Sequence, residues 1–118
     1  KPGYVEALFT LARVTGMASI SQGEALYRQG LSLKPHDGVR WRELGDLLRE
    51  SDPQAAIQAY LACCENGDPG SHGCLRAGLT AEALGDLENA IVYLRRSQFS
   101  GALEKADEIE ARIRPEAP

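Results

Sequence analysis

The sequence predicts an all-α fold built from one repeated unit, and two observations lead to this prediction. The apolar residues are mostly Leu and Ala, while aromatic residues make up only 6% of the 118 residues, and such a composition favours helices over β-sheet. A pattern of large and small residues also recurs at intervals of about 33 residues. The length is that of a single domain covering residues 1–118.

The repeat consists of a large-x-x-large-small pattern that occurs three times. The three copies, in the same register, are Leu8, Leu11 and Ala12, then Trp41, Leu44 and Gly45, then Cys74, Ala77 and Gly78. Each copy is followed by a small, a bulky and a second small residue: Gly23, Tyr27 and Gly30; Ala56, Tyr60 and Cys63; Ala90, Leu94 and Ser97. Internal repetition of this length indicates stacked units that each form one helical hairpin.

Each unit is expected to contain two helices, and turn residues separate them. Pro53 suits the first turn of a helix, Gly85 supplies a turn, and residues 67–70 form the clearest break between units. The units then cover about 4–37, 38–70 and 71–100. The predicted helices cover residues 4–15, 20–33, 38–50, 53–66, 71–83 and 87–99.

The segment after Gly101 predicts one more helix, at about 101–114. Its spacing places Leu103, Ala106, Ile109 and Ile113 on one face. We interpret it as a capping helix or as the opening helix of a further unit. The remaining tail is expected to fray.

Gly45 lies in the middle of a predicted helix, where glycine costs about 1 kcal/mol relative to alanine. Two helices joined by a short turn approach closely only where the facing side chains are small. We therefore expect Gly45 to face Ala56, and the pairs Ala12 with Gly23 and Gly78 with Ala90 to repeat this arrangement.

The W-x-x-L-G register followed by a small residue, an aromatic residue and a proline resembles the tetratricopeptide repeat (TPR) family. The segments "WRELGDLLRESDPQAAIQAY" and "AGLTAEALGDLENAIVYL" carry the resemblance, although the tyrosine that the family has after the glycine is Leu48 in one unit and Ala81 in the next. The resemblance implies an α-solenoid of three helix-turn-helix repeats plus a C-terminal capping helix.

The dipeptide Lys1-Pro2 recurs as Lys34-Pro35, where it ends the second helix of a unit. We therefore expect the sequence to be a fragment of a longer array. Apolar surface should then remain uncovered on the first helix, around Leu8 and Phe9.

Composition and motifs argue against several classes of function. A net charge of -4 without a concentrated basic patch disfavours nucleic-acid binding and binding to anionic lipid. No apolar stretch is long enough to insert in a membrane. His36 and His72 lie in no catalytic motif, and carboxylate pairs such as Asp46 with Glu50 are typical of a solvated helix face. We expect no enzyme activity and no cofactor.

Cys63, Cys64, His72 and Cys74 fall within a short stretch and could form a metal site. Adjacent residues on a helix point about 100° apart, so Cys63 and Cys64 do not aim at one ion. The register places Cys63 and Cys74 at core positions, which favours buried thiols. A disulfide between Cys74 and either Cys63 or Cys64 is the second interpretation, and a metal site is the third.

The resemblance implies a concave inner wall formed by the first helix of each unit. By the family's pattern, the residues on that wall are Glu6, Phe9, Arg13, Val39, Arg42, Asp46, Arg49, His72, Leu75, Leu79 and Glu82. We expect them to bind an extended peptide or a partner helix, with the arginines facing acidic groups and Phe9, Leu75 and Leu79 holding apolar side chains. The alternatives are a solvated wall, or contacts with other parts of a parent protein. None of these positions is Lys or Asn, which disfavours a chaperone-tail clamp.

The function expected from this resemblance is that of a protein-binding scaffold. The Arg- and Ala-rich repeats are similar to the periplasmic repeat regions of Pel-like bacterial exopolysaccharide export proteins. That similarity implies a periplasmic segment that recruits a polysaccharide-modifying enzyme, such as a deacetylase, during biofilm assembly. The alternatives are a cytoplasmic location, an assembly factor of a pilus or secretion system, and an architectural spacer with no binding site of its own.

Overall fold

The computed structural model describes residues 3–66 and 72–115. These residues form seven α-helices and no strand. The helices are α1 (Tyr4–Gly16), α2 (Ile20–Leu33), α3 (Gly38–Leu48), α4 (Pro53–Glu65), α5 (Gly73–Ala83), α6 (Leu87–Arg96) and α7 (Ser100–Ile113). The prediction of an all-α fold is therefore confirmed.

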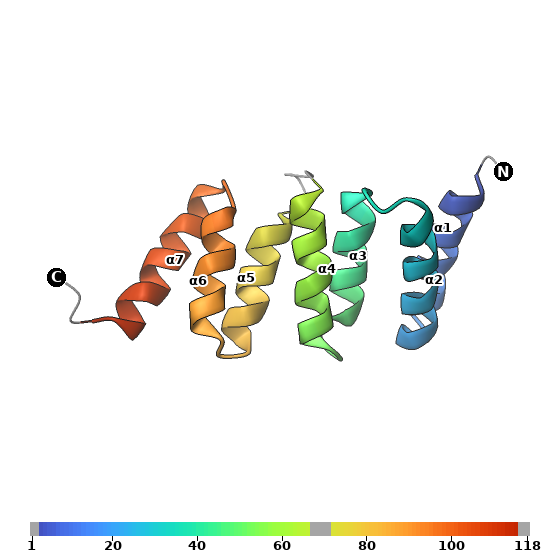
Figure 1. Cartoon of the computed structure of the whole chain (residues 1–118). Coiled ribbons are helices and arrows are strands. Elements are labelled where there is room, and N and C mark those ends of the chain that lie inside the picture. The colour runs from blue at the N-terminus through green and yellow to red at the C-terminus, as the bar shows by residue number, and fades with distance from the viewer. Residues whose placement is uncertain (1–2, 67–71, 116–118) are drawn as a thin grey trace.

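The helices stand side by side in one elongated row, with the N-terminus at one end and the C-terminus at the other (Figure 1). The row measures 59 × 26 × 17 Å. Each helix packs chiefly against its neighbours in sequence, and the core runs along the row as an unbroken cluster of buried side chains. No helix in the described part of the chain has the length and apolar character needed to cross a bilayer.

Side-chain caps explain why four of the helices begin where they do. The side chains of Ser19, Asp37, Asp52 and Asp86 each accept a hydrogen bond from the backbone N–H three residues later, which satisfies one of the free N–H groups at a helix start. Pro53 occupies the first turn of α4, as predicted.

Three helix boundaries differ from the predicted ones by two residues or more. Helix α3 ends at Leu48, and α6 ends at Arg96 because Ser97 is extended and its hydroxyl accepts a hydrogen bond from the N–H of Phe99. Helix α5 begins at Gly73, after His72 in the left-handed region with φ 52°. Residue 71, where this helix was predicted to start, lies outside the described residues.

The small residues do allow close packing, and the atoms nearest to the missing side chain of Gly45 belong to Tyr60 and not to the expected Ala56. A Cβ built at Gly45 would lie 2.5 Å from Cε1 of Tyr60, so the missing side chain makes room for that ring. Gly78 accommodates Leu94 in the same way, at 2.5 Å from its Cγ. The bulky residue of the second helix, rather than its small residue, therefore fills the space over the glycine.

The first hairpin comes closest to the expected backbone contact. A Cβ at Gly23 would lie 2.6 Å from Cα of Gly16 and 3.2 Å from the carbonyl oxygen of Ala12. Gly23 therefore lets α1 and α2 meet backbone to backbone. The corresponding position in the other hairpins is alanine, which is buried in both cases, at Ala56 and Ala90.

A disulfide joins Cys64 at the end of α4 to Cys74 at the start of α5, with their Cα atoms 5.2 Å apart. The favoured prediction of buried thiols is therefore wrong for these two residues. It is right for Cys63, which is buried and takes no part in a disulfide. Gly73 explains the approach, because a Cβ there would lie 2.6 Å from the backbone nitrogen of Cys64. No cluster of potential metal ligands occurs within the residues that the structure describes.

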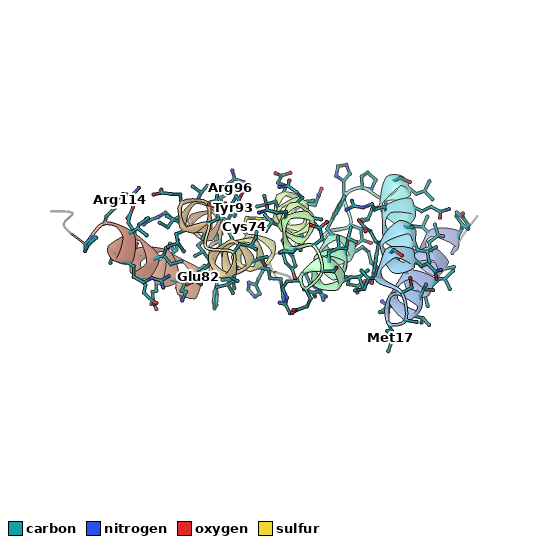
Figure 2. The ribbon with its side chains drawn as sticks, turned by 90° about the horizontal axis from the view of Figure 1, so that it is seen from below. Met17, Cys74, Glu82, Tyr93, Arg96 and Arg114 are labelled. Carbon is teal, nitrogen blue, oxygen red and sulfur yellow. A yellow bond between two sulfur atoms is a disulfide. The ribbon has the colours of Figure 1, made fainter. Side chains whose placement is uncertain are left out.

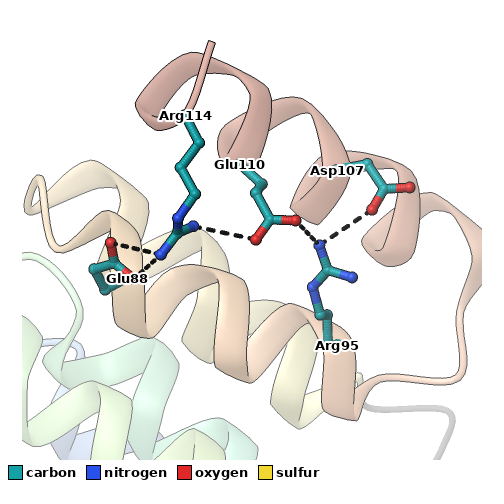
Figure 3. A network of polar contacts seen from close by, with 5 residues as sticks. All are labelled: Glu88, Arg95, Asp107, Glu110 and Arg114. Carbon is teal, nitrogen blue, oxygen red and sulfur yellow. Dashed lines mark hydrogen bonds and ion pairs between the residues drawn. The ribbon is translucent and has the colours of Figure 1, made fainter. Parts of the chain in front are cut away.

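Helix α7 packs on α6 through a smaller apolar face and a network of ion pairs. Ala102, Ala106 and Ile109 are buried, whereas Leu103, predicted to share their face, is exposed. Figure 3 shows the network: Arg95 contacts Asp107 at 3.2 Å and Glu110 at 2.8 Å, and Arg114 contacts Glu88 and Glu110, both at 3.1 Å. These pairs tie the last helix to the row.

Candidate partner-binding grooves

An open groove lies between α1 and α3 and has room for about 350 Å³. We call it the α1–α3 groove. It brings together three of the predicted wall residues, Arg13, Arg42 and Asp46. Its other lining residues are Ala12, Gly16, Met17, Tyr27, Glu43 and Leu47.

At one side of this groove, the carboxylate of Glu43 contacts a tyrosine and two arginines. Its carboxylate accepts a hydrogen bond of 3.2 Å from the hydroxyl of Tyr27 and one of 2.9 Å from Arg40. Arg13 lies 3.6 Å from the same carboxylate. The sequence prediction left out Glu43, although Arg40 and Glu43 stand at the i, i+3 spacing that brings side chains together on a helix.

Asp46 has the same role one turn further along α3. It accepts a hydrogen bond of 2.5 Å from the hydroxyl of Tyr60, and its other oxygen accepts one of 3.1 Å from Arg42. Arg76 of α5 lies 3.6 Å from it. Arg13 and Arg42 were predicted to face acidic groups of a partner, but both already contact carboxylates of this chain.

Burial and these carboxylates change the proton affinity of the two tyrosines. Burial, followed by the charge of Glu43 and its hydrogen bond, raises the pKa of Tyr27 to about 12. Burial and the hydrogen bond to Asp46 raise the pKa of Tyr60 as well. Although burial alone would lower the pKa of Arg42, the contact with Asp46 raises it overall.

We expect the protein to lose stability in alkali, and Tyr27→Phe to reduce that loss. The pKa of Tyr27 is higher in the folded chain than the ordinary value of 10. Its contribution is therefore complete below pH 10 and is lost as the pH rises towards 12. At pH 11, midway between the two values, about half of this contribution is lost, roughly 1 kcal/mol, and the difference between urea unfolding at pH 8 and at pH 11 measures it.

The exposed Tyr4 provides the matched control for this measurement. Tyr4→Phe should leave the difference between the two pH values as it is in the wild type. An equal loss of stability in Tyr27→Phe and in the wild type would contradict the role of Tyr27.

A second open groove, the α3–α5 groove, lies beside the end of α3 and has room for about 420 Å³. It contains two other predicted wall residues, Arg49 and Leu79. Arg49 is exposed and makes no ion pair with any described residue, and Leu79 and Leu84 are exposed apolar residues. The remaining lining residues are Glu50, Pro53, Arg76, Thr80 and Ala83.

One predicted apolar contact for a partner is wrong, because Phe9 belongs to the core. Phe9 is only 1% exposed; its ring occupies the space over Gly30, and the guanidinium of Arg40 lies 5.4 Å from its centre. Leu75 is partly buried and packs against the core. The resemblance implied a wall position for both residues; Phe9 instead packs against α2 and Arg40, whereas the wall position of Leu75 stays a prediction.

The other predicted wall residues do not line either groove. Glu6 forms an ion pair with Lys34, whose hydrogen bond lowers the pKa of Glu6. Glu82 contacts Lys105 at 3.2 Å and Arg112 at 2.9 Å on α7 and raises the pKa of Lys105. Val39 is partly buried.

His72 has a local role at the start of α5. It is the residue before the helix, and its ring centre lies 5.3 Å from that of Phe99. It lines neither groove. The eleven predicted wall residues are thus spread over two grooves, the core and the joints between helices.

No family model and no curated protein matches this sequence. The fold and the two grooves are therefore the observations on which a function can be inferred.

Proposed function

We propose that this chain is a protein-binding scaffold segment, a TPR-like α-solenoid that holds a partner in grooves beside its odd-numbered helices. The repeated contacts support the repeat assignment: glycine in the first helix of a hairpin lies under a bulky residue of the second, in α3 with α4 and in α5 with α6. Contacts chiefly between sequence neighbours are typical of such stacked repeats.

The observation that carries the proposal is the α3–α5 groove. It combines exposed apolar side chains, Leu79 and Leu84, with the guanidinium of Arg49, which has no carboxylate partner among the described residues. A partner that inserts an apolar side chain and places a carboxylate on Arg49 would satisfy both features. A helix or an extended peptide could do so.

The disulfide supports a location in an oxidising compartment. Such bonds persist in secreted and periplasmic proteins and are rare in the cytosol. With the resemblance to Pel-like export proteins, this favours a periplasmic scaffold for exopolysaccharide export that recruits a polysaccharide-modifying enzyme, such as a deacetylase. A cytoplasmic assembly factor for a pilus or secretion system is the less favoured setting.

The architectural spacer remains a second candidate, because one observation favours it. In the α1–α3 groove, Arg13 and Arg42 are already occupied by Glu43 and Asp46. Arginines that already form ion pairs within the chain gain less from the carboxylates of a partner. A spacer 59 Å long would separate other domains without binding anything itself.

Charge reversal at Arg49 distinguishes the two candidates. We expect Arg49→Glu to weaken capture of a partner from a periplasmic extract by roughly tenfold or more, because a carboxylate on the partner would then face a like charge. The measurement is a pull-down on the immobilised chain, quantified by mass spectrometry. Arg42 is left unchanged because its loss would also disturb the contacts of Asp46.

Arg96→Glu is the matched control, since Arg96 is an exposed arginine of α6 that lines neither groove. It should capture the same proteins as the wild type. A spacer predicts that no protein is lost with Arg49→Glu, and that result would refute the binding proposal.

A further inference from the structure

Helix α1 carries a row of exposed apolar residues along one side, where only the hydroxyl of Tyr4, at the start of the row, contacts a described residue of another helix by a side-chain hydrogen bond, which it accepts from Gln29 of α2. Tyr4 is 46% exposed, Leu11 52% and Val14 61%, and Ala7 lies between them. Their spacing alternates between three and four residues, which places them on one face of the helix. Met17, 87% exposed, projects beyond the end of the same helix (Figure 2).

This outer face contains no charged residue. The charged residues of α1, Glu6 and Arg13, are turned towards Lys34 and Glu43 of the row. The helix at the other end differs: Glu104, Asp107, Glu108 and Arg112 of α7 are all exposed. Of the two ends of the described row, the N-terminal one is therefore suited to an apolar neighbour, and the charged end of a second copy does not complement it.

The repeat shows what occupies the same face elsewhere in the chain. Leu11 corresponds to Leu44 in α3 and to Ala77 in α5, and both of these residues are fully buried. Val14 corresponds, in the same register, to Leu47 and Thr80. Leu47 is partly buried and Thr80 is buried.

The preceding hairpin reaches two of the positions that are equivalent to this row. A Cβ at Gly16 would lie 3.1 Å from a methyl carbon of Leu47, so the first hairpin covers this side of α3. Gly73, the equivalent of Ala7, lies against α4: a Cβ there would be 2.5 Å from the carbonyl oxygen of Tyr60 and 3.0 Å from Cβ of Cys63. In α3 and α5 the face that is bare in α1 is thus an interface.

We propose that the outer face of α1 is a docking surface for an amphipathic helix of the kind of α2 and α4. The occupant is a helix whose apolar face is uncharged and includes small residues. Cys63 is such a residue in α4, where it lies against Gly73. It would cover Leu11 and Val14, whose equivalents in α3 and α5 are buried or partly buried. This inference is independent of partner binding in the two grooves but rests on the repeat register of the proposed function.

An extended chain tests the proposal directly. A second copy of residues 1–33 is fused to the N-terminus, so that the added α2 leads into Lys1-Pro2 just as the native α2 leads into Lys34-Pro35. We expect the melting temperature to rise by about 5 °C or more, because the apolar row of the inner α1 becomes buried.

Leu11→Glu with Val14→Glu supplies a matched pair of variants in this extended chain. In the inner copy of α1 the two substitutions should lower the melting temperature by roughly 10 °C, because they place charges in the new interface. The same substitutions in the outer copy, where the row is exposed, should change it little. Equal effects in the two copies would overturn the proposal.

The original chain provides a further test of the occupant. Light scattering coupled to gel filtration should show a monomer at micromolar concentration. A dimer that Leu11→Glu with Val14→Glu converts to a monomer would show that a second copy is the occupant, and would overturn the proposal.

Discussion

Gly45→Leu is expected to lower the free energy of unfolding by about 2 kcal/mol. Even the first carbon of the new side chain would lie 2.5 Å from the ring of Tyr60, in a part of the core that is fully buried. Overpacking of this kind costs roughly 1–3 kcal/mol or somewhat more, which outweighs the roughly 1 kcal/mol that leucine gains over glycine as a helix former. Urea unfolding followed by circular dichroism measures the change.

A double-mutant cycle identifies the cause of that loss. If the clash with Tyr60 is responsible, Gly45→Leu combined with Tyr60→Ala should cost clearly less than the sum of the two single substitutions. Ala25→Leu, on the exposed side of α2, is the control and should change stability by less than about 0.5 kcal/mol. Additive effects would mean that Gly45 does not serve to accommodate the ring.

Loss of the Cys64–Cys74 disulfide is expected to cost about 3 kcal/mol. The bond closes a short loop, with a sequence separation of 10, and a cross-link of this length restricts the unfolded chain by that amount. The variant with Cys64→Ala and Cys74→Ala should therefore unfold at a lower urea concentration. The wild type should behave similarly after reduction.

Cys63→Ala is the matched control, because Cys63 is buried nearby but takes no part in the disulfide. This variant should still lose stability on reduction, whereas the variant without Cys64 and Cys74 should not respond to reductant at all. A wild type whose unfolding midpoint is unchanged by reduction would contradict the prediction.

The helices could be predicted from the sequence because apolar spacing indicates all of them and a second signal supports several. Apolar spacing indicates the buried face, and side chains such as Ser19, Asp52 and Asp86 mark the helix starts. The ends of α3 and α6 could not be predicted, since they depend on local turns such as the one made by Ser97 and Phe99.

The role of the glycines was only partly predictable. The repeat reveals that Gly45 and Gly78 need to be small, but not which neighbour uses the space. That choice depends on the rotation of one helix against the other, which brings Tyr60 and Leu94 over the glycines. Spacing along a single chain does not contain this angle.

The candidate site was harder to predict than the fold. The resemblance implied one concave wall that includes Arg13, Arg42, Asp46, Arg49 and Leu79, and these five residues line the two grooves. A pattern of positions does not show which residues of the same chain will pair with these side chains. The contacts of the arginines with Glu43 and Asp46, and the burial of Phe9, depend on neighbouring helices.

The disulfide was an open alternative in the sequence because two adjacent cysteines, Cys63 and Cys64, are about equally close to Cys74 along the chain. The choice between them depends on which side of α4 meets α5. Gly73 allows the start of α5 to approach α4 closely at this point, where Cys64 meets Cys74 and Cys63 is buried.

The single-file arrangement of the helices has a mechanical consequence. Each helix contacts chiefly its immediate neighbours in sequence. A force applied between the two termini therefore passes through the interfaces between successive helices one after another, which we call joints. The joint between α4 and α5 lies near the midpoint, and it is reinforced by a covalent bond that non-covalent joints lack. Tension would therefore separate the outer hairpins before it parted the two halves of the molecule.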